Sequence, residues 1–213
     1  MKITREQTQK NYDRLSRWYD RLASNEKAFT ELGLQMLAVK EGERALEIGF
    51  GTGHALAALA QRTGDAGLTV GVELSQGMIA QARKRQQVEG RGRGAQMLQG
   101  DAAHLPFLRA SFDAIFLSFT LELFADEEIP LVLGECRRVL RPGGRLGVVC
   151  MAEGKALACR LYEWGHARWP ALLDCRPIAA RTWLEQAGFY LQAATIRASW
   201  GLPIEILLGV APG

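Results

Sequence analysis

Short apolar runs alternate along the chain with longer stretches in which apolar residues recur at helical spacing. The runs typical of strands are residues 44–49, 68–74, 95–100, 113–119, 145–151, 190–199 and 203–210. Because strands that alternate with helices form parallel sheets through right-handed crossovers, the first five runs predict a parallel sheet. The last two runs have only Gly201 and Leu202 between them. That connection is too short for a parallel crossover, so it predicts an antiparallel hairpin.

Helices are predicted both before the first strand and between the strands. Residues 7–22 carry aromatic and leucine side chains at helical spacing, and residues 27–39 form a second apolar-faced segment. Further helices are expected at 54–61 and at about 126–140, where Pro142-Gly143-Gly144 ends the helix and turns the chain into the fifth strand. The expected fold is therefore α/β, a Rossmann-like open sheet of seven strands with helices on both faces.

Length and composition fit one globular domain. The chain has 213 residues, of which 48% are hydrophobic, and this is enough for one large α/β domain with a full core. No apolar run approaches the roughly 18 residues that span a bilayer, and residues 1–10 are too polar for a secretory signal, so a cytoplasmic location is expected. The four cysteines show no C-x-x-C spacing. They predict neither a zinc site nor a disulfide framework.

The charge of the chain gives little support for nucleic-acid binding, because the formal net charge is only +3. The one basic cluster, Arg83-Lys84-Arg85 with Arg91 and Arg93, falls at the end of a predicted helix, where positive side chains are favourable. A solvated face is the favoured interpretation of this cluster, and a phosphate-binding patch is the alternative.

The first strand runs into three alternating glycines. Residues 44–53 read Arg-Ala-Leu-Glu-Ile-Gly-Phe-Gly-Thr-Gly and lead into a predicted helix. Glycine allows the backbone conformations of such a turn and lets a ligand lie against the main chain, while the free N–H groups of the helix start face that ligand. The alternative is a plain connector between strand and helix.

Two details distinguish the ligands that this turn would accept. The dinucleotide fingerprint G-x-G-x-x-G needs a third glycine where this chain has His54, which disfavours a nicotinamide cofactor. The second strand ends on Glu73, whose carboxylate can accept both hydroxyls of a ribose. An adenosine-type ligand fits both observations, whereas a solvated glutamate at a strand end is the structural alternative.

Five segments follow one another in order over roughly residues 40 to 150, namely 47–53, 72–78, 100–107, 112–119 and 138–145. Together they resemble the successive motifs of class I S-adenosylmethionine-dependent methyltransferases. Within that superfamily, residues 117–124 and the Leu-Pro-Phe at 105–107 are most similar to ubiquinone and menaquinone biosynthesis C-methyltransferases and to bacterial phospholipid N-methyltransferases. The pairs Tyr12-Asp13 and Tyr19-Asp20 are similar to the N-terminal segment of the same groups.

The resemblance implies a set of residues that bind S-adenosylmethionine, with S-adenosylhomocysteine as the product. The turn would cradle the methionine end, the second strand end would hold the ribose, and the next two segments would enclose the adenine. In chain order the residues are Glu47, which would support the turn, Gly49, Gly51, Thr52, Gly53, Glu73, Leu74, Met78, Asp101, Ala102 and Ser118. For Met78, packing in the core is as good an explanation as contact with adenine. For Ser118, the alternative to a place near the methionine moiety is a simple cap of the fourth strand.

The implied chemistry is an in-line displacement at the sulfonium methyl group, to which the protein contributes mainly by positioning the acceptor in a dry pocket. A general base is needed only if the acceptor must lose a proton. His166 is the candidate for this base, and the alternative is that His166 is only a surface or packing residue. Tyr12 and Tyr19 would close an N-terminal helical lid, residues 1–40, or dock against the sheet. Residues 155–178, with Trp164, form a substrate-side helical insertion or simply pack a further helix onto the sheet.

The residues after the fourth strand and the aromatic side chains bear on the nature of the methyl acceptor. Ser118-Phe-Thr-Leu follows the fourth strand in place of an Asn/Asp-Pro-Pro-Tyr sequence, which argues against amino groups of DNA bases or glutamine side chains as acceptors. The aromatic lining favours a small hydrophobic or aromatic, quinone-like molecule. The alternatives are a phospholipid headgroup reached by peripheral membrane contact and a cofactor-binding protein without catalysis. No metal is implied, and no oligomeric state is predicted.

Overall fold

The computed structural model describes residues 26–89, 94–154, 159 and 175–213. Its helices are α3 (Glu26–Leu37), α4 (His54–Thr63), α5 (Gln76–Glu89), the short η2 (Leu121–Leu123), α6 (Ile129–Val139) and α8 (Ala180–Gln186). Its strands are β1 (Arg44–Ile48), β2 (Leu68–Glu73), β3 (Ala95–Gln99), β4 (Phe112–Ser118), β5 (Leu140–Met151), β6 (Tyr190–Ser199) and β7 (Leu202–Val210).

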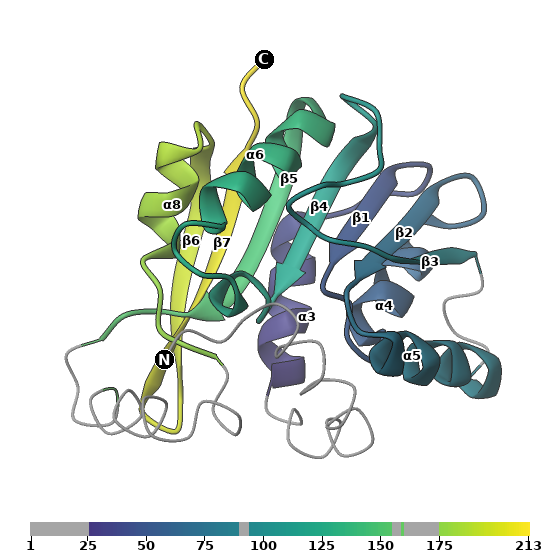
Figure 1. Ribbon diagram of the computed structural model, residues 1–213, viewed down its shortest axis with the longest axis horizontal. Helices are drawn as coiled ribbons and strands as arrows, with labels where there is room; N and C mark the ends of the chain where they lie inside the picture. Colours follow the sequence, from purple (N-terminus) through teal and green to yellow (C-terminus); the bar gives the residue numbers. More distant parts are fainter. Residues whose placement is uncertain (1–25, 90–93, 155–158, 160–174) are drawn as a thin grey trace.

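The seven strands form one sheet in the order β3-β2-β1-β4-β5-β7-β6 (Figure 1). The neighbours from β3 to β5 pair in parallel, and β7 pairs antiparallel with both β5 and β6. The predicted fold class is therefore confirmed, including the C-terminal hairpin, because two residues between β6 and β7 leave no other way to connect them.

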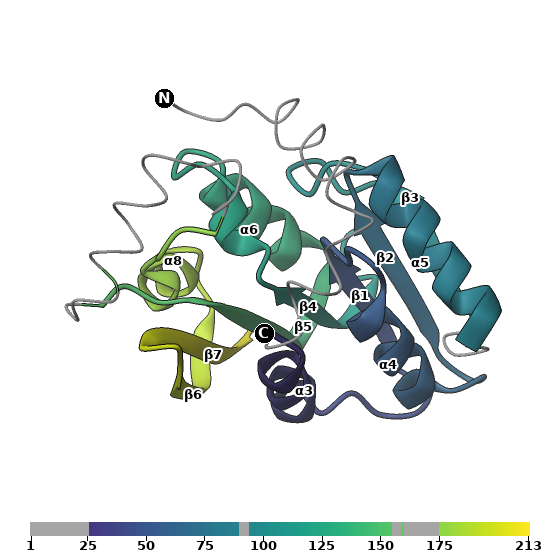
Figure 2. The ribbon, with the colours of Figure 1, turned by 90° about the horizontal axis from the view of Figure 1, so that it is seen from below.

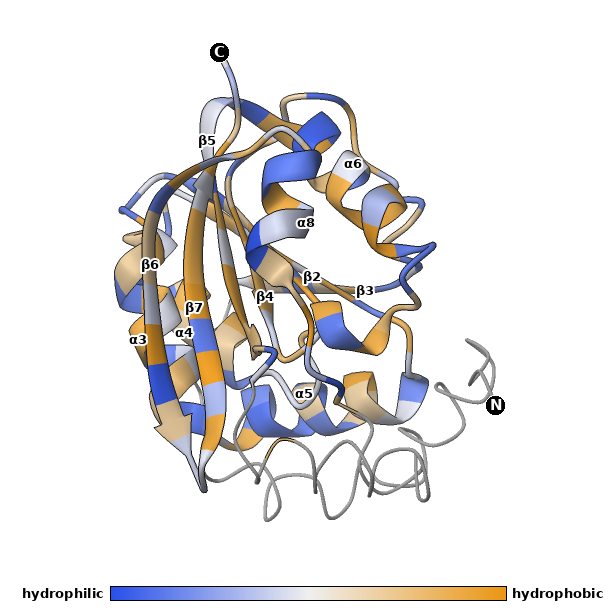
Figure 3. Cartoon of the chain, turned by 90° about the vertical axis from the view of Figure 1, so that its left-hand side faces the viewer, coloured by the Kyte–Doolittle hydropathy of each residue, from blue (hydrophilic) through white to orange (hydrophobic). Residues whose placement is uncertain are grey.

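Helices cover both faces of the sheet, with α3 and α4 on one face and α6 and α8 on the other (Figure 2). The pleat of each strand directs successive side chains to opposite faces. Phe116 of β4 accordingly packs with the leucines of α3 and α4, whereas Ile115 and Leu117 pack with α6 and α8. The strands between the helical layers are coloured as mostly hydrophobic in Figure 3, while the helices alternate apolar and polar residues.

The observed strand ends agree with the predicted ones to within one residue, except at the start of β5. The prediction of a strand beginning at residue 145 was wrong, because Leu140 already pairs with Phe112. Residues 141–144 then bulge out before Ala114 pairs with Arg145, and Gly143 in this bulge has a φ of +72°. The Pro-Gly-Gly sequence therefore lies inside an irregular strand, and α6, observed at Ile129–Val139, is shorter than predicted.

Several predicted features lie wholly or largely outside the described residues. The helix at residues 7–22 is one, and most of the lid at 1–40 and of the insertion at 155–178 are others. Within the described part, the predicted helix at 27–39 is observed as α3. No helix there has the length and apolar character needed to cross a membrane. All four cysteines are free thiols.

Gly33 allows α3 to lie unusually close to the sheet. A Cβ at this position would lie 2.5 Å from Cγ2 of Val149 and 3.0 Å from the ring of Phe116. Both of these side chains are fully buried, and a β-branched valine in a strand has little freedom to move away. The absence of a side chain at Gly33 is therefore a condition for the packing of α3 on β4 and β5.

We predict opposite effects of the same substitution at two helical glycines. Gly33→Ala lowers the free energy of unfolding by about 1–3 kcal/mol, because the added methyl group overpacks the helix–sheet contact. Gly134→Ala in α6, where a Cβ would meet nothing within 4 Å, raises it by about 0.5–1 kcal/mol through helix propensity. Urea denaturation measures both values. A Gly33→Ala protein as stable as Gly134→Ala would contradict the close packing of α3.

Candidate active site

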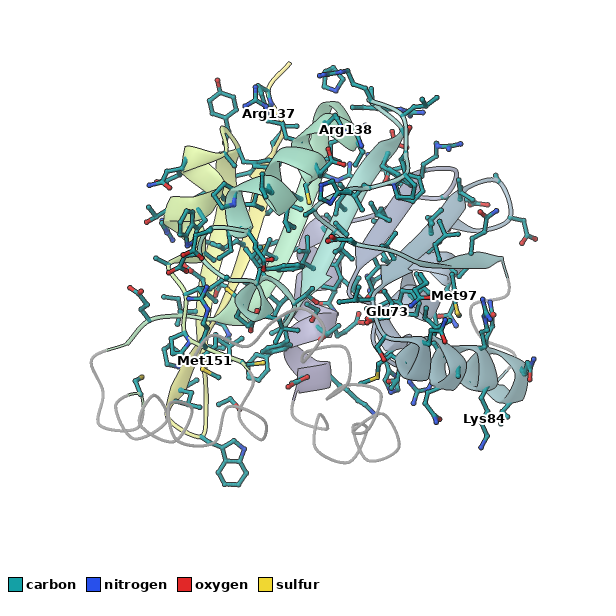
Figure 4. All side chains as sticks on the ribbon, viewed as in Figure 1. Glu73, Lys84, Met97, Arg137, Arg138 and Met151 are labelled. Atoms are coloured by element: carbon teal, nitrogen blue, oxygen red, sulfur yellow. The ribbon has the colours of Figure 1, made fainter. Side chains whose placement is uncertain are left out.

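The candidate site lies where β1, β2 and β4 end, at the edge of the sheet that carries Glu73 in Figure 4. The turn after β1 contains three glycines with left-handed backbones, Gly49, Gly51 and Gly53, at φ values of +68°, +51° and +83°. The N–H of Gly49 donates to the carbonyl of Val72 at 2.8 Å, which ties the turn to the end of β2. The predicted glycine turn thus has a backbone that glycine adopts without strain and that other residues would adopt only at a cost.

The three glycines differ in what a side chain would meet. A Cβ at Gly49 would collide with the side chain of Thr120, and one at Gly53 would lie 3.0 Å from the Cβ of Ala82. At Gly51 it would meet nothing within 4 Å. Packing therefore requires glycine at the first and third positions, whereas the middle position borders open space that a ligand can occupy.

Glu47 is a buried acid in the wall of this site. Because it follows Ala45 by two residues in β1, its side chain points to the α3 and α4 face, and only 3% of the residue is exposed. No hydrogen-bond partner for its Oε2 atom is found in the described part of the chain. Burial, together with the nearby charge of Glu73, raises the pKa of Glu47 to about 8. The carboxyl group is therefore protonated at neutral pH in this state.

Glu73 holds the glycine turn in place from the end of β2. Its Oε2 atom accepts a hydrogen bond from the N–H of Gly51 at 3.0 Å, and its Oε1 atom accepts one from the N–H of Ser75 at 2.9 Å. At Gly51 the turn is thus supported by Glu73. The ribose contact of Glu73 stays a prediction, as does the role of Glu47.

The expected adenine residues gather at the ends of β2 and β3, which are joined by a hydrogen bond from the Gly100 N–H to the Glu73 carbonyl. The Oδ1 atom of Asp101 accepts from the N–H of Ala103 at 2.9 Å, so this carboxylate also shapes its own turn. Leu74 is half-buried, and Ala102 and Met78 are buried. Contact of these residues with an adenine ring stays a prediction.

A pocket of about 340 Å³ opens between the glycine turn, the start of α4 and the first turns of α3. Ser118, at the end of β4, and Thr30, in α3, line this pocket and form a hydrogen bond with each other, with their hydroxyl oxygens 2.8 Å apart. The expected site residues that line the pocket are Glu47, Gly49, Gly51, Thr52 and Ser118. The structure thus brings these predicted methionine-end residues together around one cavity, while Gly53 is not among its lining residues.

Three residues of this region were not predicted as site residues: Thr30, Thr120 and Arg85. The hydroxyl of Thr120 donates to the carbonyl of Ser118 at 3.0 Å and lies 3.4 Å from that of Gly49. One nitrogen of Arg85 donates to the carbonyl and the hydroxyl of Thr52, at 2.7 and 2.9 Å. The assignment of Arg85 to a solvated basic face was therefore wrong. The contact between Arg85 and Thr52 depends on the packing of α5 beside the turn, and the local sequence does not indicate that packing.

Four predicted residues lie outside the described part of the chain. They are the lid candidates Tyr12 and Tyr19, the substrate-side Trp164 and the candidate base His166. Their roles stay predictions.

We predict that Glu47 makes the ligand-free protein less stable as the pH rises. Its pKa in the folded state, about 8, exceeds the ordinary value of 4.5, so the unfolded state releases this proton first. The free energy of unfolding therefore falls between about pH 5 and about pH 8, by an amount on the order of a few kcal/mol. Glu47→Gln, which cannot titrate, flattens this slope in urea denaturation, whereas Glu41→Gln at an exposed position keeps it. Equal slopes for the wild type and Glu47→Gln would contradict the prediction.

The chain matches a family model described as a methyltransferase domain over residues 45–144. It is 37% identical over 113 residues to a demethylmenaquinone methyltransferase of Lactobacillus johnsonii, covering 53% of this chain and 46% of that protein. It is 34% identical over 146 residues to one of Bacillus velezensis, covering 68% of this chain and 60% of that protein. The matched region thus spans about half to three fifths of the length of these relatives.

The fold itself is shared with solved structures. A methyltransferase of Aquifex aeolicus described as S-adenosylmethionine-dependent superposes with a TM-score of 0.70 at 18% identity, covering 93% of this chain and 98% of that one. The chain thus carries a methyltransferase domain over residues 45–144 and is similar to the demethylmenaquinone methyltransferases, and its fold is shared with a methyltransferase structure.

Proposed function

We propose that the protein transfers a methyl group from S-adenosylmethionine to a small aromatic, quinone-like acceptor by in-line displacement. The observation that carries this proposal is the open space at Gly51, in a turn that the carboxylate of Glu73 holds and whose pocket the buried Glu47 also lines. The quinone-like acceptor is supported by the relatives, whose names include demethylmenaquinone as the methylated molecule.

The residues around the pocket fit S-adenosylmethionine chemically. A buried acid such as Glu47, with an oxygen that lacks a partner in the described residues, suits a ligand that carries positive sulfonium and ammonium groups, because an opposite charge favours the ionised form. We infer that the ligand displaces the proton of Glu47 on binding. The affinity for S-adenosylmethionine would then rise with pH up to the pKa of this group.

Glu73 offers a carboxylate to the ribose. Its two oxygens accept hydrogen bonds from the N–H groups of Gly51 and Ser75, and an ionised carboxylate is an acceptor of the kind that ribose hydroxyls need. Since both N–H groups belong to the backbone, they fix the carboxylate in one orientation before the ligand arrives. Asp101, Leu74, Met78 and the Ala102 main chain would complete the adenosine site at the neighbouring strand ends.

The turn and Ser118 would hold the methionine end. The hydroxyl of Thr52 is engaged by Arg85, so its contribution would come through the backbone of the turn, together with Gly49 and Gly53. Ser118 and Thr30 form the opposite wall of the pocket.

When bound, S-adenosylmethionine supplies a methyl group that its positive sulfur has already activated. The protein then has to orient the acceptor and exclude water, and such positioning is worth roughly 7–11 kcal/mol at best. His166 is proposed as a base only for an acceptor that must lose a proton, and Tyr12, Tyr19 and Trp164 as the residues that close the acceptor side.

Two measurements test the proposed function. Calorimetry is expected to show binding of S-adenosylmethionine and S-adenosylhomocysteine but not of a nicotinamide dinucleotide. Mass spectrometry is then expected to detect methylation of a reduced naphthoquinone but not of phosphatidylethanolamine in vesicles. Methylation of the lipid alone would show that the acceptor is a phospholipid headgroup and not a quinone-like molecule. Cofactor binding without turnover on either acceptor would favour a non-catalytic protein.

We predict that Gly51→Ala separates ligand binding from folding. The methyl group would enter the open space at this turn, so the affinity for S-adenosylmethionine falls by at least about tenfold, equivalent to about 1.4 kcal/mol. Gly42→Ala is the matched control, because Gly42 also has a positive φ and open space around a Cβ. Both variants lose about 1–2 kcal/mol of stability from the left-handed backbone. Unchanged affinity in Gly51→Ala would place the ligand elsewhere.

We also predict that Arg85 increases the affinity for S-adenosylmethionine by holding Thr52 of the glycine turn in place. Arg85→Gln removes the charged donor to Thr52 and lowers the affinity for S-adenosylmethionine by about tenfold, since hydrogen bonds of charged groups contribute about 1.5–3 kcal/mol. Lys84→Gln makes the same change of charge at the neighbouring exposed position, which points away from the site in Figure 4, and leaves the affinity unchanged. Calorimetric titrations of both variants provide the measurement. An equal loss in both would indicate a general charge effect rather than a held turn.

A further inference from the structure

A second concave surface lies between α6 and α8, away from the glycine turn. This α6–α8 groove has a volume of about 490 Å³, within the range of small-molecule sites. Its lining residues are Arg109, Pro130, Gly134, Arg137, Arg138, Trp183, Gln186 and Ala187. Arg137 and Arg138 lie at the edge of the sheet opposite to Glu73 in Figure 4, so the groove is separate from the candidate active site.

The floor and one wall of the groove are apolar. Pro130 and Gly134 occupy successive turns of the exposed side of α6, and a Cβ at Gly134 would meet nothing within 4 Å. Ala187 and the half-buried Trp183 face them from α8. The small residues leave room beside the indole, and an aromatic face of this kind can pack against a flat apolar group.

Three arginines line the groove, and none of the lining residues is Asp or Glu. One of the three, Arg138, is neutralised by Glu135, which does not line the groove, with an Nε–Oε1 distance of 2.6 Å. For Arg137 the structure gives one bond, to the carbonyl of Ala187 at 3.2 Å. No carboxylate in the described residues forms an ion pair with Arg137 or with the exposed Arg109.

This arrangement differs from that of other arginines on the same protein. Arg141 pairs with Asp113 and Arg145 with Glu43, each through a short contact. Two unpaired guanidinium groups beside an aromatic wall are the chemistry that recognises a phosphate or carboxylate, because the planar donor fork of arginine matches such an anion. The side-chain amide of Gln186 adds a neutral donor at the same place.

We propose that the α6–α8 groove binds an organic anion, with a phosphate or carboxylate group held by Arg109 and Arg137 and a flat apolar body packed against Trp183. The ligand would bind together with whatever occupies the glycine turn, because the two sites share no residue. The proposal does not depend on methyl transfer.

The test uses the full chain and simple probes. Biphenyl phosphate and biphenyl carboxylate supply both parts of the expected ligand, hydroxybiphenyl lacks the anion, and inorganic phosphate lacks the apolar body. Calorimetry is expected to show saturable binding of one or both biphenyl anions, at least about tenfold tighter than binding of the two partial probes. The comparison of the two anions identifies which anionic group the arginines prefer.

Variants locate the bound probe. The double variant Arg109→Gln/Arg137→Gln is expected to weaken binding of the biphenyl anion by at least about tenfold. Arg83→Gln/Lys84→Gln, with the same change of charge on exposed positions of α5, leaves it unchanged. Gly134→Leu fills the groove from an exposed helix position and abolishes binding, while its thermal unfolding shows that the protein is folded.

Three results would overturn the proposal. The first is the absence of saturable binding for both biphenyl anions. The second is unchanged binding in the arginine double variant or in Gly134→Leu. The third is displacement of the probe by S-adenosylhomocysteine, which would place the anion at the glycine turn instead.

Discussion

The parallel pairing of β1 with β2 on one side and β4 on the other determines where every part of the candidate site lies. Glu47 of β1 pairs with Gly71 of β2 and with Phe116 of β4, so the ends of three strands meet at one edge. In sheets of this kind ligands bind where the strand order reverses, outside the carboxyl ends. The pleat then turns Glu47 and Glu73 to the same face.

Two carboxyl groups on neighbouring strands serve the site in opposite ways. Glu73 is satisfied by backbone N–H groups and makes the turn rigid. Glu47 is buried with an oxygen that has no partner in the described residues, a costly arrangement that stability alone would not retain. Under the proposed function, this cost is the stability that the protein gives up in the ligand-free state for a preformed binding site, as functional sites in other proteins do.

The features that could be predicted are those that depend on residues close together in the sequence. Strand ends, the glycine turn and the terminal hairpin follow from periodicity, from glycine and from connection length. The contacts that fix the site could not be predicted, because they join distant segments: Thr30 and Ser118 are 88 residues apart, and Thr120 and Gly49 are 71 apart. Arg85 looked like part of a solvated cluster for the same reason. At β5, the local signal of Pro142-Gly143-Gly144 indicated a helix end, but only pairing with β4 shows that the strand has already begun.

The position of β7 between β5 and β6 has a consequence for the order of assembly. Since β6 comes earlier in the chain but pairs within the sheet only with β7, it has no neighbour in the sheet until β7 has been synthesised. The five parallel strands can form while β5 still has a free edge and β6 is an unpaired segment, and an unpaired edge invites association with other chains. We therefore expect that, on the ribosome, the β5 edge stays open until β7 pairs with β5 and joins β6 to the sheet.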